Sequence, residues 1–151
     1  LQACHAGWKV TADQDPIAIQ GQGEVLVSVF GNLANNALDA CGDGARLDWR
    51  VNEQDNTVVI SLRDNGPGIA DDLREQIFEP FFTTRANGTG LGLAVVRAVI
   101  VAHRGDIELD AEYQDGAHFV VRLPVCQVQQ HLPSEGLQKQ QKAAIPSLRY
   151  V

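Results

Sequence analysis

Polar side chains interrupt an otherwise apolar segment at residues 30–40, which reads FGNLANNALDA. Asn32 and Asn36 are four residues apart, so they share one face of a helix. Asn35 and Asp39 share the neighbouring face. An amide oxygen is a neutral, hard ligand that suits Mg2+. The segment could therefore hold a magnesium ion, although the same asparagines could also simply cover the solvated side of an amphipathic helix.

A carboxylate and two glycines fall together in the sequence DNGPGI, at residues 64–69. Asp64 directly follows a predicted strand, whose end could hold the carboxylate rigidly. Gly66 and Gly68 allow the backbone to approach a ligand closely or to adopt a positive φ. The alternative is an ordinary turn, because Asn-Gly and Pro-Gly are common turn pairs.

Three of the five phenylalanines fall within residues 78–84, which read FEPFFTT. Aromatic side chains gathered in a loop beside glycine-rich segments indicate a lid that packs down in one state and lifts in another. The alternative is a loop that its aromatic residues pin to the core.

Alternating glycines precede an apolar, helix-like stretch in the sequence GTGLGL, at residues 88–93. Backbone N–H groups and the positive end of a helix dipole then converge on one place, which is typical of a phosphate site. The spacing matches neither the P-loop nor the dinucleotide-binding fingerprint. Taken alone, such a glycine pattern is weak support for any ligand.

The periodicity of apolar residues predicts the elements that must position these four segments. Helices are predicted at residues 24–41 and 93–103, a short helical piece at 71–78, and strands at 17–20, 46–52, 57–63, 106–112 and 117–123. Gly42 and Gly44 should end the first helix, and Gly105 should cap the second. The strands at 46–52 and 57–63 read as one antiparallel hairpin, and those at 106–112 and 117–123 as a second. We therefore predict a two-layer α/β sandwich, with a mixed, mostly antiparallel sheet and helices on one face.

Composition excludes several classes of protein. The 151 residues carry a net charge of −7, which argues against a nucleic-acid-binding protein. The three cysteines are too widely spaced for a metal site or a disulfide framework, so we expect reduced thiols. No apolar run is long enough to span a membrane. Because the chain contains no methionine, we expect it to be a piece of a longer protein.

Together and in this order, the four segments resemble the N, G1, F and G2 boxes of the catalytic domain of sensor histidine kinases. These kinases share a superfamily with DNA gyrase, Hsp90 and MutL. The resemblance covers about residues 17–124, and the short segment between the last two boxes is similar to the nitrogen-regulation class. It implies the Bergerat (GHKL) ATP-binding fold, which agrees with the predicted sandwich. Residues 1–16 would then lead in from a missing dimerisation and phosphoacceptor domain, and residues 125–151, rich in Gln, Lys, Ser and Pro, would form a flexible tail.

The resemblance implies ATP and Mg2+ as ligands and assigns roles to single residues. Asn36 would bind the metal and Asn32 would lie beside the phosphates. Asp64 would accept a hydrogen bond from the exocyclic amine of adenine. Arg85 would reach the γ-phosphate, whereas Asp39 stands where many relatives carry a basic residue and should make no phosphate contact. The other nucleotide-binding residues implied are Gly66, Gly68, Ile69, Phe81, Thr83, Thr84, Gly88, Thr89, Gly90, Leu91, Gly92 and Leu93.

The resemblance also implies the reaction, which is transfer of the γ-phosphoryl group to a histidine. In the gyrase, Hsp90 and MutL relatives a glutamate stands at the position of Asn32 and activates water. An amide is not a useful general base, so we expect slow ATP hydrolysis. None of the four histidines stands in an acceptor motif, so the isolated domain should not complete autophosphorylation. The alternatives are another ATPase of the superfamily, an anti-sigma serine kinase, or a non-catalytic nucleotide-binding module.

The resemblance further implies a setting and two local departures. We expect a homodimeric full-length protein that acts on a response regulator. This domain should be cytoplasmic, in a protein that is either cytoplasmic or anchored in the inner membrane. Arg104 replaces the first glycine of a His-Gly-Gly turn common in the family, and Ala117 replaces a threonine common near the last strand.

Overall fold

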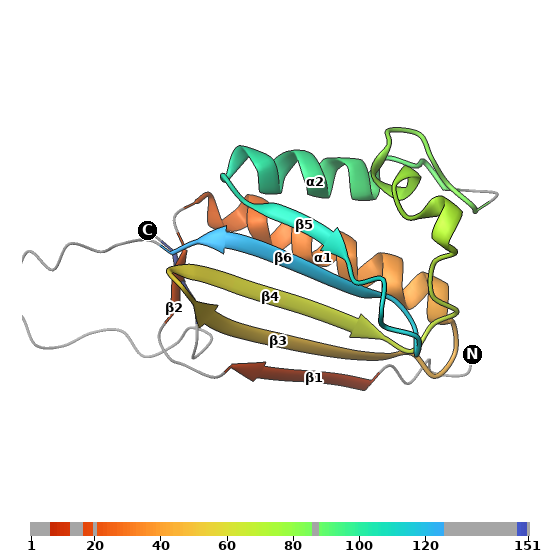
Figure 1. Ribbon diagram of the computed structural model, residues 1–151, viewed down its shortest axis with the longest axis horizontal. Helices are drawn as coiled ribbons and strands as arrows, with labels where there is room; N and C mark the ends of the chain where they lie inside the picture. The colour runs from red at the N-terminus through yellow and green to blue at the C-terminus, as the bar shows by residue number, and fades with distance from the viewer. Residues whose placement is uncertain (1–6, 13–16, 20, 86–87, 126–147, 151) are drawn as a thin grey trace, which may run out of the picture.

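The computed structural model describes residues 7–12, 17–19, 21–85, 88–125 and 148–150. Two α-helices and seven strands make up most of this part (Figure 1). In chain order the elements are β1 (Gly7–Ala12), β2 (Ile17–Ile19), α1 (Gly23–Cys41), β3 (Arg46–Gln54), β4 (Thr57–Asp64), the 3-10 turns η1 (Asp71–Leu73) and η2 (Gln76–Phe78), α2 (Gly92–Ala102), β5 (Asp106–Leu109), β6 (His118–Pro124) and β7 (Leu148–Tyr150).

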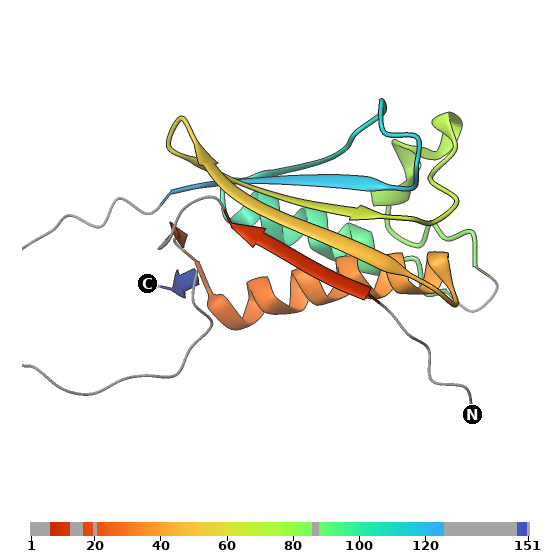
Figure 2. The same ribbon diagram turned by 90° about the horizontal axis from the view of Figure 1, so that it is seen from below.

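Five of the strands form one mixed sheet in the order β1-β3-β4-β6-β5. β1 is parallel to β3, and the other neighbours are antiparallel. Both predicted hairpins, β3 with β4 and β5 with β6, are present. α1 and α2 cover one face of the sheet, and the two layers are seen edge-on in Figure 2. The predicted two-layer sandwich with a mostly antiparallel sheet is thus confirmed.

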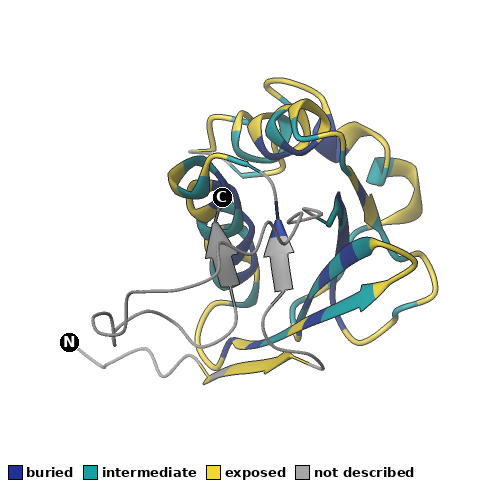
Figure 3. Ribbon diagram, turned by 90° about the vertical axis from the view of Figure 1, so that its left-hand side faces the viewer, coloured by how far each residue is buried: buried dark blue, intermediate teal, exposed yellow. Residues whose placement is uncertain are grey.

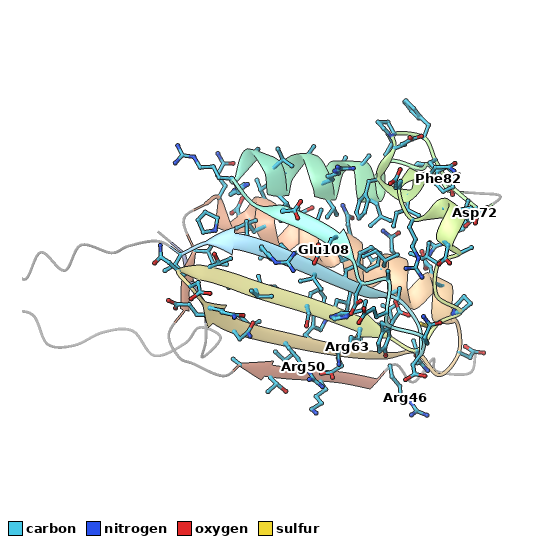
Figure 4. The ribbon with its side chains drawn as sticks, viewed as in Figure 1. Arg46, Arg50, Arg63, Asp72, Phe82 and Glu108 are labelled. Atoms are coloured by element: carbon cyan, nitrogen blue, oxygen red, sulfur yellow. The ribbon has the colours of Figure 1, made fainter. Side chains whose placement is uncertain are left out.

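The core lies between the helices and the sheet. Figure 3 shows the buried residues on the sides that face each other. Along β3, Leu47 and Val51 are buried, whereas Arg46 and Arg50 are exposed on the opposite face (Figure 4). The largest core side chains with less than 2% of their surface exposed are Ile19, Leu26, Leu33, Leu47, Leu62, Ile100, Leu123, Val29, Val58, Val96 and Val121. Burial of these apolar groups is the main force that fixes the helices on the sheet.

The two helices run in opposite directions (Figures 1 and 2). The C-terminal half of α1 therefore lies at the same end of the molecule as the N-terminus of α2. β4 also ends there, with Asp64 as its last residue. The topology thus brings the asparagine segment, the DNGPGI segment and the glycine loop to one end of the sandwich.

The ordered structure extends beyond the range 17–124 predicted from the sequence. β1 lies within residues 1–16 and forms an edge strand of the main sheet, with Trp8 and Val10 alternating with Lys9 and Thr11 as strands require. β2 lies outside the main sheet and pairs in parallel with β7. β7 falls within the range 125–151 predicted as a tail, most of which lies outside the described residues.

α2 is less buried than its apolar sequence predicts. Val96 and Ile100 are buried, but Val95 and Val101 are 47% and 57% exposed. A helix that forms the outer layer of a sandwich buries only the stripe that faces the sheet. Within the described residues, neither α1 nor α2 has the length and apolar character needed to cross a membrane.

The turn that follows α2 differs from the prediction. Gly105 was expected to provide the cap, but the residue in the left-handed conformation is Arg104, with φ of 59°. Gly105 is needed for a different reason, because a Cβ atom there would overlap the carbonyl oxygen of Arg122. Arg104 thus occupies a position where glycine carries no steric penalty.

We predict that Arg104→Gly stabilises the protein by about 1 kcal/mol, because it removes the strain of a side chain at positive φ. Thermal unfolding should shift upward by roughly 3 to 5 °C. The matched control is Arg104→Ala, which keeps a Cβ atom and should leave the unfolding temperature nearly unchanged. An equal gain in both variants would show that the arginine side chain, and not the backbone, causes the strain.

Candidate functional site

A cleft of about 470 Å3 opens where the three chemically distinctive segments meet. It is bounded by the C-terminal half of α1, the end of β4, the η1–η2 region and the start of α2. The predicted site residues that line it are Asn36, Asp64, Gly68, Ile69, Thr83, Thr84, Arg85, Gly88, Thr89, Gly90, Gly92 and Leu93. Four predicted residues do not line it, namely Asn32, Gly66, Phe81 and Leu91. The structure therefore gathers most of the predicted residues around one cavity.

Asp64 is a rigidly held, buried carboxylate on the cleft wall. Only 4% of its surface is exposed. Its Oδ1 atom accepts the backbone N–H groups of Gly66 at 2.9 Å and Ala117 at 3.0 Å. Its own backbone N–H donates to the carbonyl oxygen of Ala117 at 3.0 Å. Charge-assisted bonds from the main chain satisfy one oxygen and fix the orientation of the other.

Gly66 has a packing role in this structure. A Cβ atom there would lie 3.0 Å from Asp64 Oδ1 and 3.1 Å from Cys41 Sγ, which is closer than such contacts normally come. Burial raises the pKa of the Cys41 thiol, and the neighbouring charge of Asp64 raises it further. Cys41 is a free, half-buried thiol, while Cys4 and Cys126 lie outside the described residues. A neutral thiol therefore packs beside the carboxylate without adding negative charge.

Asn36 faces the start of α2 across the cleft. A Cβ atom on Gly92, the first residue of α2, would lie 3.5 Å from the Asn36 Nδ2 atom. Leu91, the N-cap residue of α2, makes no side-chain capping bond, and within the described part of the chain no side chain accepts the first N–H groups of the helix. An amide from one helix and the positive end of another thus adjoin the same space. The helix N-terminus suits an anion, and the amide could supply one ligand to a cation bound beside that anion.

The described residues contain no group of three or more His, Cys, Asp or Glu side chains that could hold a metal ion. A magnesium ion does not require such a group, because it keeps several waters and takes few protein ligands when a nucleotide supplies phosphate oxygens. The oxygen of the Asn36 side chain fits that requirement.

Two backbone contacts join the phenylalanine segment to the glycine loop. Phe81 N–H donates to the Gly90 carbonyl oxygen at 2.8 Å, and both residues adopt positive φ, 69° and 65°. A Cβ atom on Gly90 would overlap the carbonyl carbon of Phe81. Only glycine therefore allows the two segments to approach this closely.

The phenylalanines of this segment have separate positions. Phe81 adopts a positive φ, is 75% exposed and lies outside the cleft lining. Phe82, labelled in Figure 4, lines the cleft instead. Phe78 is buried and packs edge-on against Phe119, with ring centroids 6.4 Å apart. One aromatic residue anchors the segment, one faces the cleft, and one faces solvent.

Arg85 links this segment to α1. Its Nη1 atom donates to Asp39 Oδ2 at 2.6 Å, and its Nη2 atom donates to the carbonyl oxygen of Asn36 at 2.7 Å. The guanidinium group therefore lies beside the asparagine that faces α2.

Sequence reasoning missed most of the apolar lining. The additional apolar residues of the lining are Ala37, Ala40, Ala70, Leu73, Ile77, Phe82, Ala117 and Phe119. Small and aliphatic residues carry no chemical signal of their own. Their place in the cleft depends on how α1, β6 and the η1–η2 region pack, so only Phe82 could have been inferred, from its neighbours.

The chain is similar to known proteins over most of its length. It matches the family described as "Histidine kinase-, DNA gyrase B-, and HSP90-like ATPase" over residues 21–127. The sensor histidine kinase ZraS of Escherichia coli O157:H7 is 41% identical to it over 117 residues, or 78% of the chain and 26% of that kinase. Sporulation kinase A of Bacillus subtilis (strain 168) is 35% identical over 116 residues, or 77% of the chain and 19% of that kinase. The chain thus spans about a fifth to a quarter of the length of these relatives.

Solved structures of histidine kinases share the fold. The mycobacterial sensor histidine kinase MprB superposes with a TM-score of 0.70 at 30% identity, covering 80% of the chain and 82% of that structure. Histidine kinase ThkA, solved with the response regulator protein TrrA, superposes with a TM-score of 0.68 at 28% identity, covering 79% of the chain and 34% of that structure. The chain therefore belongs to the histidine kinase-, DNA gyrase B- and HSP90-like ATPase family, as the catalytic ATP-binding domain of a sensor histidine kinase.

Proposed function

We propose that the cleft binds ATP with Mg2+ and presents the γ-phosphoryl group to a histidine on a separate dimerisation domain, for relay to a response regulator. One observation carries this proposal. A buried carboxylate, an asparagine amide and a glycine loop before an uncapped helix N-terminus meet around one cavity. These are the three chemical elements that an adenine base, a magnesium ion and a phosphate chain require.

Asp64 would recognise the adenine base through a hydrogen bond. Its Oδ1 atom is already used by two backbone donors, so the other carboxylate oxygen is the acceptor for an exocyclic amine. Guanine presents a carbonyl oxygen at the equivalent position, and a carboxylate cannot accept a hydrogen bond from it. Apolar walls from Ile77 and Phe119 would bury the faces of the base.

The start of α2 would bind the phosphates. Its uncapped N–H groups and the glycine-rich loop before it supply donors, and the helix dipole favours negative charge there. Asn36 would hold Mg2+ together with the phosphates of the nucleotide, and the ion would neutralise part of their charge. Arg85 would add a cation beside the γ-phosphate.

Among the described residues that line the cleft, neither carboxylate is left over to act as a base for water once the nucleotide is bound as proposed. Asp39 and Asp64 are the two carboxylates among the described residues that line it. The first is paired with Arg85, and the second accepts main-chain N–H groups. Asn32, which stands where related ATPases carry a glutamate, lies outside the lining. Slow hydrolysis is therefore expected, and it leaves the γ-phosphoryl group available for an acceptor.

The acceptor would be supplied by another domain. Of the described histidines, His103 is bonded to the carbonyl oxygen of Val99, and His118 is paired with Asp110. Neither lines the cleft. His5 and His131 lie outside the described residues, and neither stands in an acceptor motif.

An apolar surface beside the glycine loop supports docking of that domain. Phe81, Leu91 and Val95 are 75%, 39% and 47% exposed. The bond between Phe81 and Gly90 brings the first two together, and Val95 follows Leu91 by one helical turn. Exposed apolar side chains that cluster together indicate a contact surface more often than single scattered ones do. We propose that this surface contacts the phosphoacceptor helices of a homodimer.

ThkA forms a complex with the response regulator TrrA, and we propose the same class of partner for the protein that contains this domain. Because ATP is the substrate, we place the domain in the cytoplasm, whether or not the whole protein is anchored in the inner membrane. We propose that Mg2+-ATP binds within residues 17–124, with the dimerisation domain on the N-terminal side of β1 and most of 125–151 outside the catalytic unit.

We predict that Asp64→Asn weakens ATP and ADP binding at least about tenfold in titration calorimetry, because the substitution replaces an acceptor of the adenine amine with a donor. Asparagine can still accept the two backbone N–H groups through its oxygen, so the fold should persist. The control is Asp106→Asn, which removes an exposed strand carboxylate away from the cleft. Unchanged affinity in Asp64→Asn would move the base site elsewhere, and absence of binding to the unmodified chain would refute the proposed function.

We predict that Asn36→Ala abolishes the Mg2+ dependence of ATP binding and lowers phosphotransfer to a supplied phosphoacceptor domain by roughly a hundredfold or more. Asn35→Ala is the matched control, since Asn35 is exposed on the same helix and does not line the cleft. Retained phosphotransfer in Asn36→Ala would exclude its role as metal ligand.

We predict that Gly90→Ala disrupts the contact between the glycine loop and the phenylalanine segment, because its Cβ atom would overlap the backbone of Phe81. The N–H group of Phe81 should lose protection from hydrogen exchange, and ATP affinity should fall. Gly31→Ala is the control, because a Cβ atom there meets no other atom within 4 Å and replaces a mid-helix glycine. Gly31→Ala should stabilise the chain by about 0.5 to 1 kcal/mol. Similar behaviour of both variants would exclude the steric explanation.

A further inference from the structure

We propose that Asp39 is a positioning residue for Arg85, which holds the guanidinium group beside Asn36 so that the cleft favours a nucleoside triphosphate over a diphosphate. The inference rests on the proposed function, since it concerns the same cleft. Its basis is the ion pair between Asp39 on α1 and Arg85 in the segment that follows the phenylalanines.

The side chain of Arg85 is held at two points. Nη1 donates to Asp39 Oδ2 at 2.6 Å, and Nη2 donates to the Asn36 carbonyl oxygen at 2.7 Å. A guanidinium group has five N–H donors in a rigid plane. Fixing two of its nitrogen atoms sets the direction of the remaining donors, which then share the cleft with the amide of Asn36.

The backbone of Arg85 is held as well. Its N–H donates to Thr83 Oγ1 at 3.1 Å, and its carbonyl oxygen accepts the N–H of Gly88 at 3.2 Å. The carboxylate of Asp39 therefore completes a set of contacts that fixes both ends of the residue. Without that carboxylate, only the single bond to the Asn36 carbonyl oxygen would remain to orient the charged group.

Charge makes this position important. Arg85 is the one cationic residue among the described residues that line the cleft. A γ-phosphate adds negative charge that a diphosphate lacks, so a cation fixed near it is the natural source of discrimination. Long arginine side chains lose much rotational freedom when they bind, and a partner that has already ordered the side chain reduces that loss.

Asp39 also has an opposing effect, because its negative charge repels phosphates. The pair is partly exposed, with 38% of the Arg85 side chain and 63% of the Asp39 side chain accessible, so both effects are screened by solvent and salt. The two effects can still be separated. Repulsion acts whether or not Arg85 is present, whereas positioning acts only through Arg85.

The test is a double-mutant cycle on the 151-residue chain, in which calorimetry measures the affinities for ATP and ADP with Mg2+. We expect Arg85→Ala and Asp39→Asn each to lower the preference for ATP over ADP by roughly three- to fivefold, as a partly exposed charge contact allows. The double variant should lose no more than Arg85→Ala alone. Affinity for ADP should change less than affinity for ATP in every variant, since ADP lacks the phosphate that Arg85 would contact.

Asp39→Glu is the conservative control and should recover part of the ATP preference, since it restores the carboxylate on a longer side chain. An equal effect of Asp39→Asn with and without Arg85 would overturn the inference, as would a gain in ATP affinity in both backgrounds. Absence of nucleotide binding to the unmodified chain would instead refute the proposed function. Binding without this coupling refutes only the role of Asp39.

Discussion

The buried carboxylate at the end of β4 is the interaction on which the rest of the site depends. Asp64 is satisfied by backbone N–H groups from two different segments, the turn at Gly66 and Ala117, the residue before β6. A side chain at Gly116 would overlap the Asp64 carbonyl oxygen, so glycine is required where β6 approaches. A buried charge is costly unless such donors surround it. The geometry of the sheet end is therefore fixed by the need to satisfy one carboxylate.

The sequence was sufficient for features that repeat or that are chemically distinctive. Alternation predicted the hairpins, helical spacing predicted both helices, and the rare combination of asparagines, glycines and Asp64 predicted most of the cleft. It was insufficient where tertiary contact decides. The exposed side of α2 carries Val95 and Val101, which are as apolar as the buried Val96 and Ile100, and Arg97 is its one charged residue. The position of Arg104 at positive φ, and that of Phe81 outside the lining, depend on turns whose φ values the residue types do not reveal. β1 shows the alternation of apolar and polar residues that is typical of a strand, but over too few residues to predict it.

The two ends of the cleft are built differently. The wall that contains Asp64 is made of buried strand residues and main-chain hydrogen bonds, and its shape is set by core packing. The opposite end is made of a helix N-terminus, a glycine loop and a partly exposed ion pair. Recognition of the base would therefore be preorganised. Recognition of the phosphate chain would depend on weaker contacts that a ligand can rearrange at low cost.

The net charge of −7 limits how the domain can bind a polyanion. Long-range attraction cannot supply the affinity, because the field of the whole chain opposes an approaching nucleotide. Under the proposed function, attraction would come from short-range groups, namely backbone N–H donors, a helix dipole, Arg85 and a bound Mg2+ ion. Within the described lining, Asp39 and Arg85 together contribute no net charge. Asn36 is neutral, but by holding Mg2+ it would bring to the cleft a positive charge that this acidic domain lacks.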